Sequence, residues 1–479
     1  MIQHIEKIEI TKDTHPFAQA YTKCSFEEKG YIEEEFFIHG LADVYGWKDG
    51  KKVTVLPKNP YVNRILVRRP RIKERFSGNV VVEILNSTSF IDFDRCWALT
   101  WRHMMQNGDI YIGITSKPNV IPALLKFDYQ RYKALSWKNP VENPQYALAE
   151  KDLGNMEGAS SIDTEDGLFW DMLTDLAVLL RNPENELLGN YAPYYQYLAG
   201  WSQSGAYMIR FVNDFAYERQ LEQPYFDGYF SAGSASTCLP DLNQGYGRTA
   251  QKAPRRLKMV REPFMEVHTE SENALWGNTE ARGKTCFSEN MNYCIYDIPG
   301  ATHDAKSTMT DYYRNDTDVF AAGIVPVYPG KEILPNDFPY ETVFHTALHL
   351  LYEWVREGKQ PFEAEPIQTD TELRNVTDET GNAVGGLRLP FVEVPLCIYH
   401  PVSTPMKPDY AFACTLFGYV ELYTKERALK LYGSKEGYLN RFSACLGNCI
   451  RDGRILPEDE QICMNYAKRK AEEVFGQRK

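Results

Sequence analysis

The 479-residue chain lacks the patterns that mark secreted, membrane-spanning and nucleic-acid-binding proteins. No uninterrupted apolar run reaches the roughly 18 residues that a membrane span requires, so we expect no membrane-spanning segment. The first residues alternate apolar and polar side chains without the apolar core of a signal peptide, which predicts a cytoplasmic protein. The net charge of −12 argues against nucleic acid or a membrane surface as a partner. The short basic clusters 68–71 and 255–258 are interpreted as solvent-facing surfaces.

Cysteine pairs and metal-binding motifs are also missing. The 10 cysteines are scattered and none forms a C-x-x-C pair, so we expect buried free thiols. His345 and His349 stand four residues apart on a predicted helix, but the glutamate of the H-E-x-x-H motif is absent. We therefore expect no metal and no cofactor.

Buried strands alternate with helices in the first half of the chain. Residues 79–86 form a near-continuous apolar run, typical of a strand buried on both faces, and residues 109–115 repeat it. Helical patterns follow at 97–105 and 120–127. This order predicts an α/β fold with a mostly parallel sheet and helices on both faces. Further helices are predicted at 166–181, 340–357, 410–431 and 457–475, and further strands at 263–269 and 292–298.

The most informative motif is Gly200-Trp201-Ser202-Gln203-Ser204-Gly205. It lies between the apolar run 197–199 and a helical pattern at 206–212, and this layout is typical of a nucleophile elbow. The first N–H groups of the helix would favour the negative charge that develops in acyl transfer. Ser204 fits the same pattern two residues later. We prefer Ser202 as the nucleophile because it follows the strand closely.

A serine nucleophile needs a base and an acid, which in this layout follow it along the chain on loops after later strands. Glu270 and Glu272 come after the predicted strand 263–269, and His303 comes after the strand 292–298. We predict His303 as the base and carry both glutamates as candidates for the acid.

The oxyanion hole is predicted from the same layout. It combines the backbone N–H of Gln203 with an N–H from the loop after strand 79–85, around Asn86 and Ser87.

The chain resembles the large family of α/β-hydrolase-domain-containing proteins over most of its length. In that family the elbow has the form G-x-S-Q-S-G, so the resemblance accounts for Ser204 and favours Ser202. The family's acid segment, S/T-E-T-D, matches Glu270 and places Glu272 at the aspartate. Its G-x-x-H segment matches His303. The resemblance implies a serine hydrolase and ester hydrolysis, and implies little about the substrate. The segments that carry it are 75–86, 113–115, 128–132, 200–205, 269–272, 299–303, 350–358 and 381–390.

We predict one α/β-hydrolase unit over residues 1–479. It comprises a β-rich segment at 1–60, a catalytic core at 61–305 and a C-terminal segment, 306–479, packed on the core. The Gly-, Ser- and Tyr-rich stretch 225–253 is predicted to be an insertion that builds the pocket. The predicted function is serine-dependent cleavage of a small-molecule carboxylic ester through an acyl-enzyme. An acyltransferase with the same triad and a non-catalytic binding protein are the alternatives, and the oligomeric state stays open.

Overall fold

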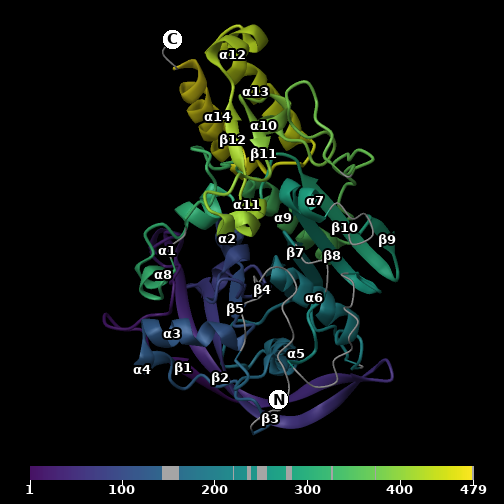
Figure 1. Cartoon of the computed structure of the whole chain (residues 1–479). Helices are drawn as coiled ribbons and strands as arrows, with labels where there is room; N and C mark the ends of the chain where they lie inside the picture. Colours follow the sequence, from purple (N-terminus) through teal and green to yellow (C-terminus); the bar gives the residue numbers. More distant parts are fainter. Residues whose placement is uncertain are drawn as a thin grey trace. The chain divides into compact units, whose positions relative to one another are not determined.

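The computed structural model, drawn in Figure 1 with colours that follow the sequence, forms two compact units. The first unit comprises Met1–Phe264, Ser288–Asn292 and Asp316–Val325, and the second comprises Met265–Phe287, Tyr293–Asn315 and Pro326–Lys479. The structure describes residues 1–142, 161–219, 221–234, 239–244, 256–276, 283–324, 327–372 and 374–476. Within the predicted insertion at 225–253, residues Gly228–Ala232 instead form a buried strand of the sheet, and residues 235–238 and 245–253 lie outside the described residues.

The first unit is built around a mixed β-sheet with the strand order β1-β2-β3-β5-β4-β6-β7. Its strands are β1 (Ile2–Ile8), β2 (Tyr31–Lys48), β3 (Lys51–Pro70), β4 (Asn79–Ile84), β5 (Ile110–Ile114), β6 (Tyr195–Trp201) and β7 (Gly228–Ala232). Strands β5, β4, β6 and β7 pair in parallel, whereas β1, β2, β3 and β5 pair antiparallel. Every residue of β4 and β5 is buried, as expected for parallel strands covered on both faces. The predicted α/β class is confirmed.

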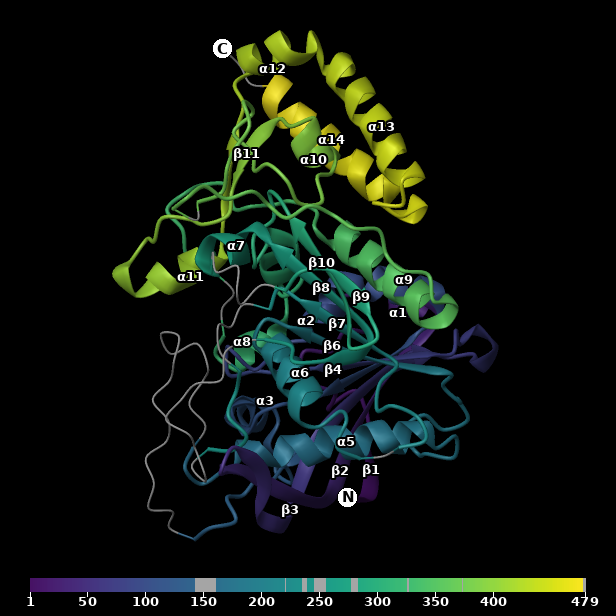
Figure 2. The same cartoon turned by 90° about the vertical axis from the view of Figure 1, so that its right-hand side faces the viewer.

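Helices cover this sheet at the places that the sequence pattern predicts. Helix α5 packs against β2 and β1, as Figure 2 shows, while α6 packs against β6 and β7. Helix α2 contacts β6 and β5 and ends at Gly108, whose positive φ of 88° suits glycine. The helices of the first unit are α1 (Phe26–Lys29), α2 (Arg95–Asn107), α3 (Ile121–Phe127), α4 (Tyr129–Tyr132), α5 (Phe169–Arg181), α6 (Gln203–Asp214) and α8 (Thr317–Ala321).

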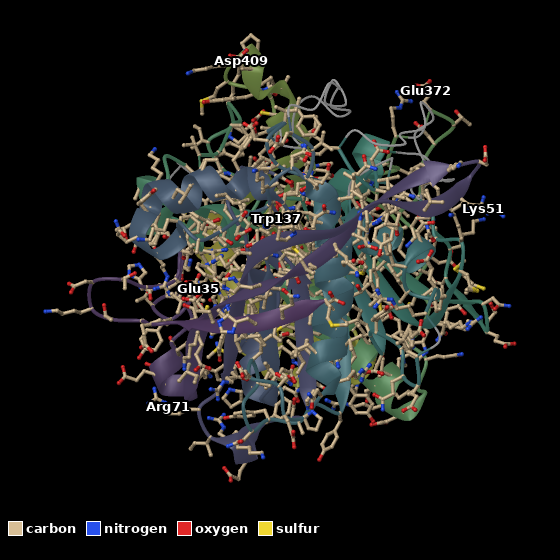
Figure 3. All side chains as sticks on the ribbon, turned by 90° about the horizontal axis from the view of Figure 1, so that it is seen from below. Glu35, Lys51, Arg71, Trp137, Glu372 and Asp409 are labelled. Atoms are coloured by element: carbon tan, nitrogen blue, oxygen red, sulfur yellow. The ribbon has the colours of Figure 1, made fainter. Side chains whose placement is uncertain are left out.

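A buried network of ion pairs connects the antiparallel strands to the loop after β4. Arg68 on β3 pairs with Glu33 on β2 at 2.6 Å and with Asp94 at 2.6 Å. Arg64 pairs in the same way with Glu35 at 2.5 Å, which is labelled in Figure 3, and with Asp92 at 3.0 Å. The expectation of a solvent-facing cluster at 68–71 is therefore wrong for Arg68, which is fully buried because its carboxylate partners compensate its charge.

The other predicted site residues follow two of three further strands, which lie mainly in the second unit. These strands are β8 (Val260–Thr269), which begins in the first unit, β9 (Cys286–Ser288) and β10 (Met291–Ile298). A separate antiparallel pair is formed by β11 (Cys397–His400) and β12 (Tyr419–Leu422). The helices are α7 (Glu270–Trp276), α9 (Glu341–Glu357), α10 (Pro390–Glu393), α11 (Ala411–Leu416), α12 (Lys425–Tyr432), α13 (Lys435–Arg451) and α14 (Glu460–Phe475).

The predicted single helix at 410–431 is wrong. The segment forms α11, then β12, then α12, because β12 gains a full set of strand partners from β11. Gly418, which precedes β12, lies so close to the backbone of His400 that a Cβ atom there would be 2.0 Å from its carbonyl oxygen. Helix α13, which packs against α14, was also not predicted.

The expectation of buried free thiols holds for most of the described cysteines. Nine cysteines in the described segments are free, and seven of these are buried; Cys445 is half-buried and Cys286 is exposed. Cys238 lies outside the described residues. Among the helices that the structure describes, none has the length and apolar character needed to cross a membrane.

Candidate active site

Ser202 occupies a sharp turn between β6 and α6. Its backbone has φ 57° and ψ −116°, a conformation that residues other than glycine adopt only when their surroundings enforce it. The N–H of Ser202 donates to the carbonyl oxygen of Ala232 on β7 at 2.9 Å, which holds the turn against the sheet. The side chain is half-buried at the N-terminus of α6, whereas Ser204 inside α6 is 1% exposed. Of the two serines, Ser202 is thus the accessible one.

The two glycines of the motif are required for different reasons. A Cβ atom on Gly200 would lie 2.7 Å from the backbone oxygen of Ser204, so the turn itself excludes a side chain there. A Cβ on Gly205 would lie 2.7 Å from Cβ of Ser234, which follows β7. The second glycine of the motif therefore serves contact with the segment at the end of β7, and its position one residue late leaves the turn intact.

Gly200→Ala is expected to destabilise the protein by about 2 kcal/mol or more, because the clashing atoms are backbone and cannot move aside. Urea unfolding monitored by circular dichroism measures the loss. Gly447→Ala is the matched control: it lies in α13, where the nearest atom to an added Cβ is a flexible guanidinium nitrogen at 3.7 Å. Alanine should stabilise that helix by up to about 1 kcal/mol. Equal effects of the two substitutions would contradict the steric role of Gly200.

The loop after β4 contacts the elbow through the residues predicted for the oxyanion hole. Nδ2 of Asn86 donates to the carbonyl oxygen of Trp201 at 3.0 Å, and Oγ of Ser87 donates to Oε1 of Gln203 at 3.0 Å. Gln203 is 8% exposed, and its Nε2 has no hydrogen-bond partner among the described residues. The structure thus brings Asn86, Ser87, Gln203 and Ser202 together within the first unit.

Glu272 and His303 meet in the second unit. Oε1 of Glu272 lies 2.5 Å from Nδ1 of His303, and its Oε2 accepts the N–H of Thr269 at 2.5 Å. Both side chains are at most 3% exposed. Burial alone would raise the pKa of Glu272, but the charge and hydrogen bond of His303, with the Thr269 N–H, bring it below the ordinary value. Glu272 is therefore held as a carboxylate against the imidazole.

Glu270 has different partners. Its Oε2 accepts the N–H of Gly300 at 2.6 Å, and its Oε1 accepts from Nδ2 of Asn375 at 3.1 Å. Burial raises the pKa of Glu270 to about 7, against these two hydrogen bonds and the charge of Arg388. Glu270 connects α7 to the turn after β10, and the structure does not bring its carboxylate to His303.

The protonation of Glu270 predicts how stability changes with pH. Because its folded pKa of about 7 exceeds its ordinary 4.5, the folded state binds more protons than the unfolded chain between these values. The free energy of unfolding should fall by roughly 3 kcal/mol as pH rises from 4.5 to 7, and then level off. Glu270→Gln should flatten this part of the profile in urea unfolding at pH 4.5 to 8. Glu426→Gln, at a solvent-exposed position, is the control. A Glu270→Gln profile as steep as that of wild type would refute the raised pKa of Glu270.

Sequence reasoning missed the residues that support the imidazole. Oγ of Ser271 accepts the backbone N–H of His303 at 3.1 Å and donates to the carbonyl oxygen of Pro401 at 2.7 Å. Thr302, next to His303, donates to the carbonyl oxygen of Leu416 at 2.8 Å. The signal in the sequence was weak: a hydroxyl residue between two glutamates, and another beside the histidine.

The other histidines have structural partners. Nε2 of His268 lies 3.0 Å from Oε1 of Glu266, and Nδ1 of His345 lies 2.9 Å from the carboxylate of Asp459. In the part of the chain that the structure describes, no three His, Cys, Asp or Glu side chains are grouped as a metal ion would require.

Comparison with known proteins gives one match over almost the whole chain. A family model described as alpha/beta hydrolase domain matches residues 5–465. No curated protein matches the chain in sequence.

Solved structures also show some similarity. An alpha-beta serine hydrolase homologue from Coxiella burnetii is 11% identical, with 55% of this chain and 91% of that chain covered and a TM-score of 0.24. The esterase Est22 is 11% identical, with 64% and 82% covered and a TM-score of 0.33. XC6422 from Xanthomonas campestris, described as an α/β serine hydrolase without lid, is 11% identical, with 61% and 97% covered and a TM-score of 0.26.

Proposed function

Because this chain belongs to the alpha/beta hydrolase domain family, we propose that it is a hydrolase that cleaves a carboxylic ester of a small molecule with Ser202 as nucleophile. The observation that carries the proposal is the backbone of Ser202, held at φ 57° at the first turn of α6. A strained, half-exposed serine at a helix N-terminus is costly to maintain and is placed where negative charge is stabilised.

Formation of the acyl-enzyme is the first half of the proposed reaction. Nε2 of His303 accepts the proton of Ser202 Oγ as this oxygen bonds to the ester carbonyl carbon. The carbonyl oxygen becomes an oxyanion, which the backbone N–H groups of Gln203 and Ser87 stabilise. The N–H of Asn86 does not take this role, because it donates to the carbonyl oxygen of Phe93 at 3.0 Å. The tetrahedral intermediate then expels the alcohol, which takes the proton from His303, and the acyl group stays on Ser202.

Deacylation repeats these steps with water. His303 accepts a proton from water while the water oxygen attacks the acyl carbon, and the carboxylic acid leaves as Ser202 recovers its proton. Glu272 accepts the N–H at Nδ1 throughout, which selects the tautomer with an unprotonated Nε2 as the base and stabilises the imidazolium. The short Glu272–His303 contact and the lowered pKa of Glu272 support this assignment of the acid over Glu270.

The experiment that tests the function is reaction with a fluorophosphonate probe, followed by a screen of chromogenic esters. Wild type should be labelled, with peptide mass spectrometry locating the adduct on Ser202, and should hydrolyse at least one ester of the screen. Added acceptor alcohols separate hydrolysis from acyl transfer, because a transferase would form the new ester faster than the free acid. Absence of labelling would reject the serine nucleophile in favour of a binding protein.

A further inference from the structure

A cavity of about 630 Å³ lies within the first unit. Its volume falls within the range of roughly 300 to 1,000 Å³ that small-molecule sites occupy. The wall is mainly apolar and includes two aromatic side chains. The lining residues include Phe90, Pro118, Pro122, Ala123, Leu135 and Trp137.

The cavity is formed by loops at the same edge of the sheet as Ser202. Phe90 belongs to the loop after β4, and Pro118 belongs to the segment after β5. Strands β5, β4 and β6 are parallel neighbours, so the loops at their carboxyl ends meet at one edge. Ser202 follows the carboxyl end of β6. This edge is where open α/β sheets bind their ligands.

Ser87 connects the cavity wall to the elbow. Its carbonyl oxygen accepts the N–H of Phe90 at 3.0 Å and Nδ2 of Asn119 at 3.2 Å, while its Oγ donates to Gln203. Asn119 lines the cavity and is 6% exposed. Asn119 thereby fixes the segment after β5 to the loop after β4 on this wall.

Phe90 is held in a strained conformation beside this cavity. Its φ is 63°, which a bulky residue rarely adopts, and its side chain is 46% exposed. An exposed ring gains little from burial, so packing of the free protein does not explain why phenylalanine occupies this position. Strained residues concentrate at sites that clamp ligands.

We propose that this cavity receives the bulky apolar side of the ester substrate, an aryl or branched alkyl group. Phe90 contacts this group from the loop after β4. Lys126 and Lys138 also border the cavity, which disfavours a cationic substituent. The inference rests on the proposed function and assigns its substrate class.

Two pairs of esters test the proposal. The first compares 4-nitrophenyl benzoate with 4-nitrophenyl acetate, and the second compares 1-naphthyl acetate with ethyl acetate. For each pair the ratio of kcat/KM, bulky to small, is measured. Ala123→Trp, which fills the cavity from α3, should lower this ratio at least tenfold in one pair or the other. Gln130→Trp on α4 is the matched control, because Gln130 is exposed and does not line the cavity.

Phe90→Gly separates a role in binding from a role in folding. Glycine adopts a positive φ without strain, so the midpoint of thermal unfolding should stay the same or rise. The ratio of kcat/KM, bulky to small, should fall for the affected pair of esters. A lower midpoint with unchanged ratios would mean that Phe90 is structural.

The two possible failures can be told apart. Wild type that hydrolyses the small esters while Ala123→Trp leaves both ratios unchanged would overturn the cavity proposal alone. Binding of 2-naphthoate to Ser202→Ala protein, measured by calorimetry, does not depend on turnover. A complex that Ala123→Trp weakens at least tenfold supports the cavity even if no ester is cleaved, and no detectable binding to the Ser202→Ala protein argues against it.

Discussion

Ser202→Ala is expected to lower kcat by about 10⁵- to 10⁶-fold, because removing the nucleophile of a triad abolishes the covalent route. The residual rate would come from the oxyanion hole and from substrate binding. The readout is steady-state kinetics on the best ester of the screen, with fluorophosphonate labelling of the same protein. Labelling of Ser202→Ala at the wild-type rate would remove Ser202 from the mechanism.

Ser204→Ala is the matched control for this experiment. Ser204 lies two residues away in the same motif, and it is buried in α6. Its substitution should cost less than about tenfold in kcat, since the residue contributes packing and not chemistry. If Ser204→Ala were the inactive variant and Ser202→Ala active, the nucleophile would have been assigned in the wrong register.

Glu272→Gln is expected to lower kcat by about 10⁴-fold. The amide keeps the size of the side chain but carries no charge, and its N–H₂ group no longer selects the imidazole tautomer that exposes a basic Nε2. The loss should appear in kcat, because the substrate does not contact Glu272 in this mechanism.

Glu270→Gln provides the comparison within the same helix turn. Glu270 contacts Gly300 and Asn375, and its raised pKa of about 7 means that a neutral side chain suits this environment. We expect a change in kcat of less than tenfold. Losses of equal size in the two variants, or a larger loss for Glu270→Gln, would contradict Glu272 as the acid.

The choice between these glutamates illustrates where sequence reasoning ended. The sequence placed both at the end of a strand but did not predict that α7 begins at Glu270 itself. Residues two apart on a helix point in nearly opposite directions, so one turn of helix sends the two carboxylates to different partners. Because the position where α7 begins was not predicted, both glutamates stayed candidates for the acid.

Other parts of the fold were predictable because their signals are local. One short stretch of consecutive residues contains the signal for each of them: the apolar runs of β4 and β5, and the turn between β6 and α6. Arg68 was not predictable, because its partner Glu33 is 35 residues away and the sequence does not state which charges will meet. Strand β12 was not predicted for the same reason, since its pairing with β11 is a long-range contact.

The buried ion pairs of the N-terminal strands limit how this protein can be shortened or recombined. Asp92 and Asp94 belong to the segment that runs from β4 into α2. Arg64 and Arg68 lie on β3, and Glu35 and Glu33 on β2 provide the remaining negative charge that each arginine needs. A truncation that removed β2 would leave these arginines undercompensated in the interior, and breaking one such pair costs roughly 3 to 5 kcal/mol. The first 70 residues and the segment after β4 must therefore be inherited, exchanged or redesigned as one piece.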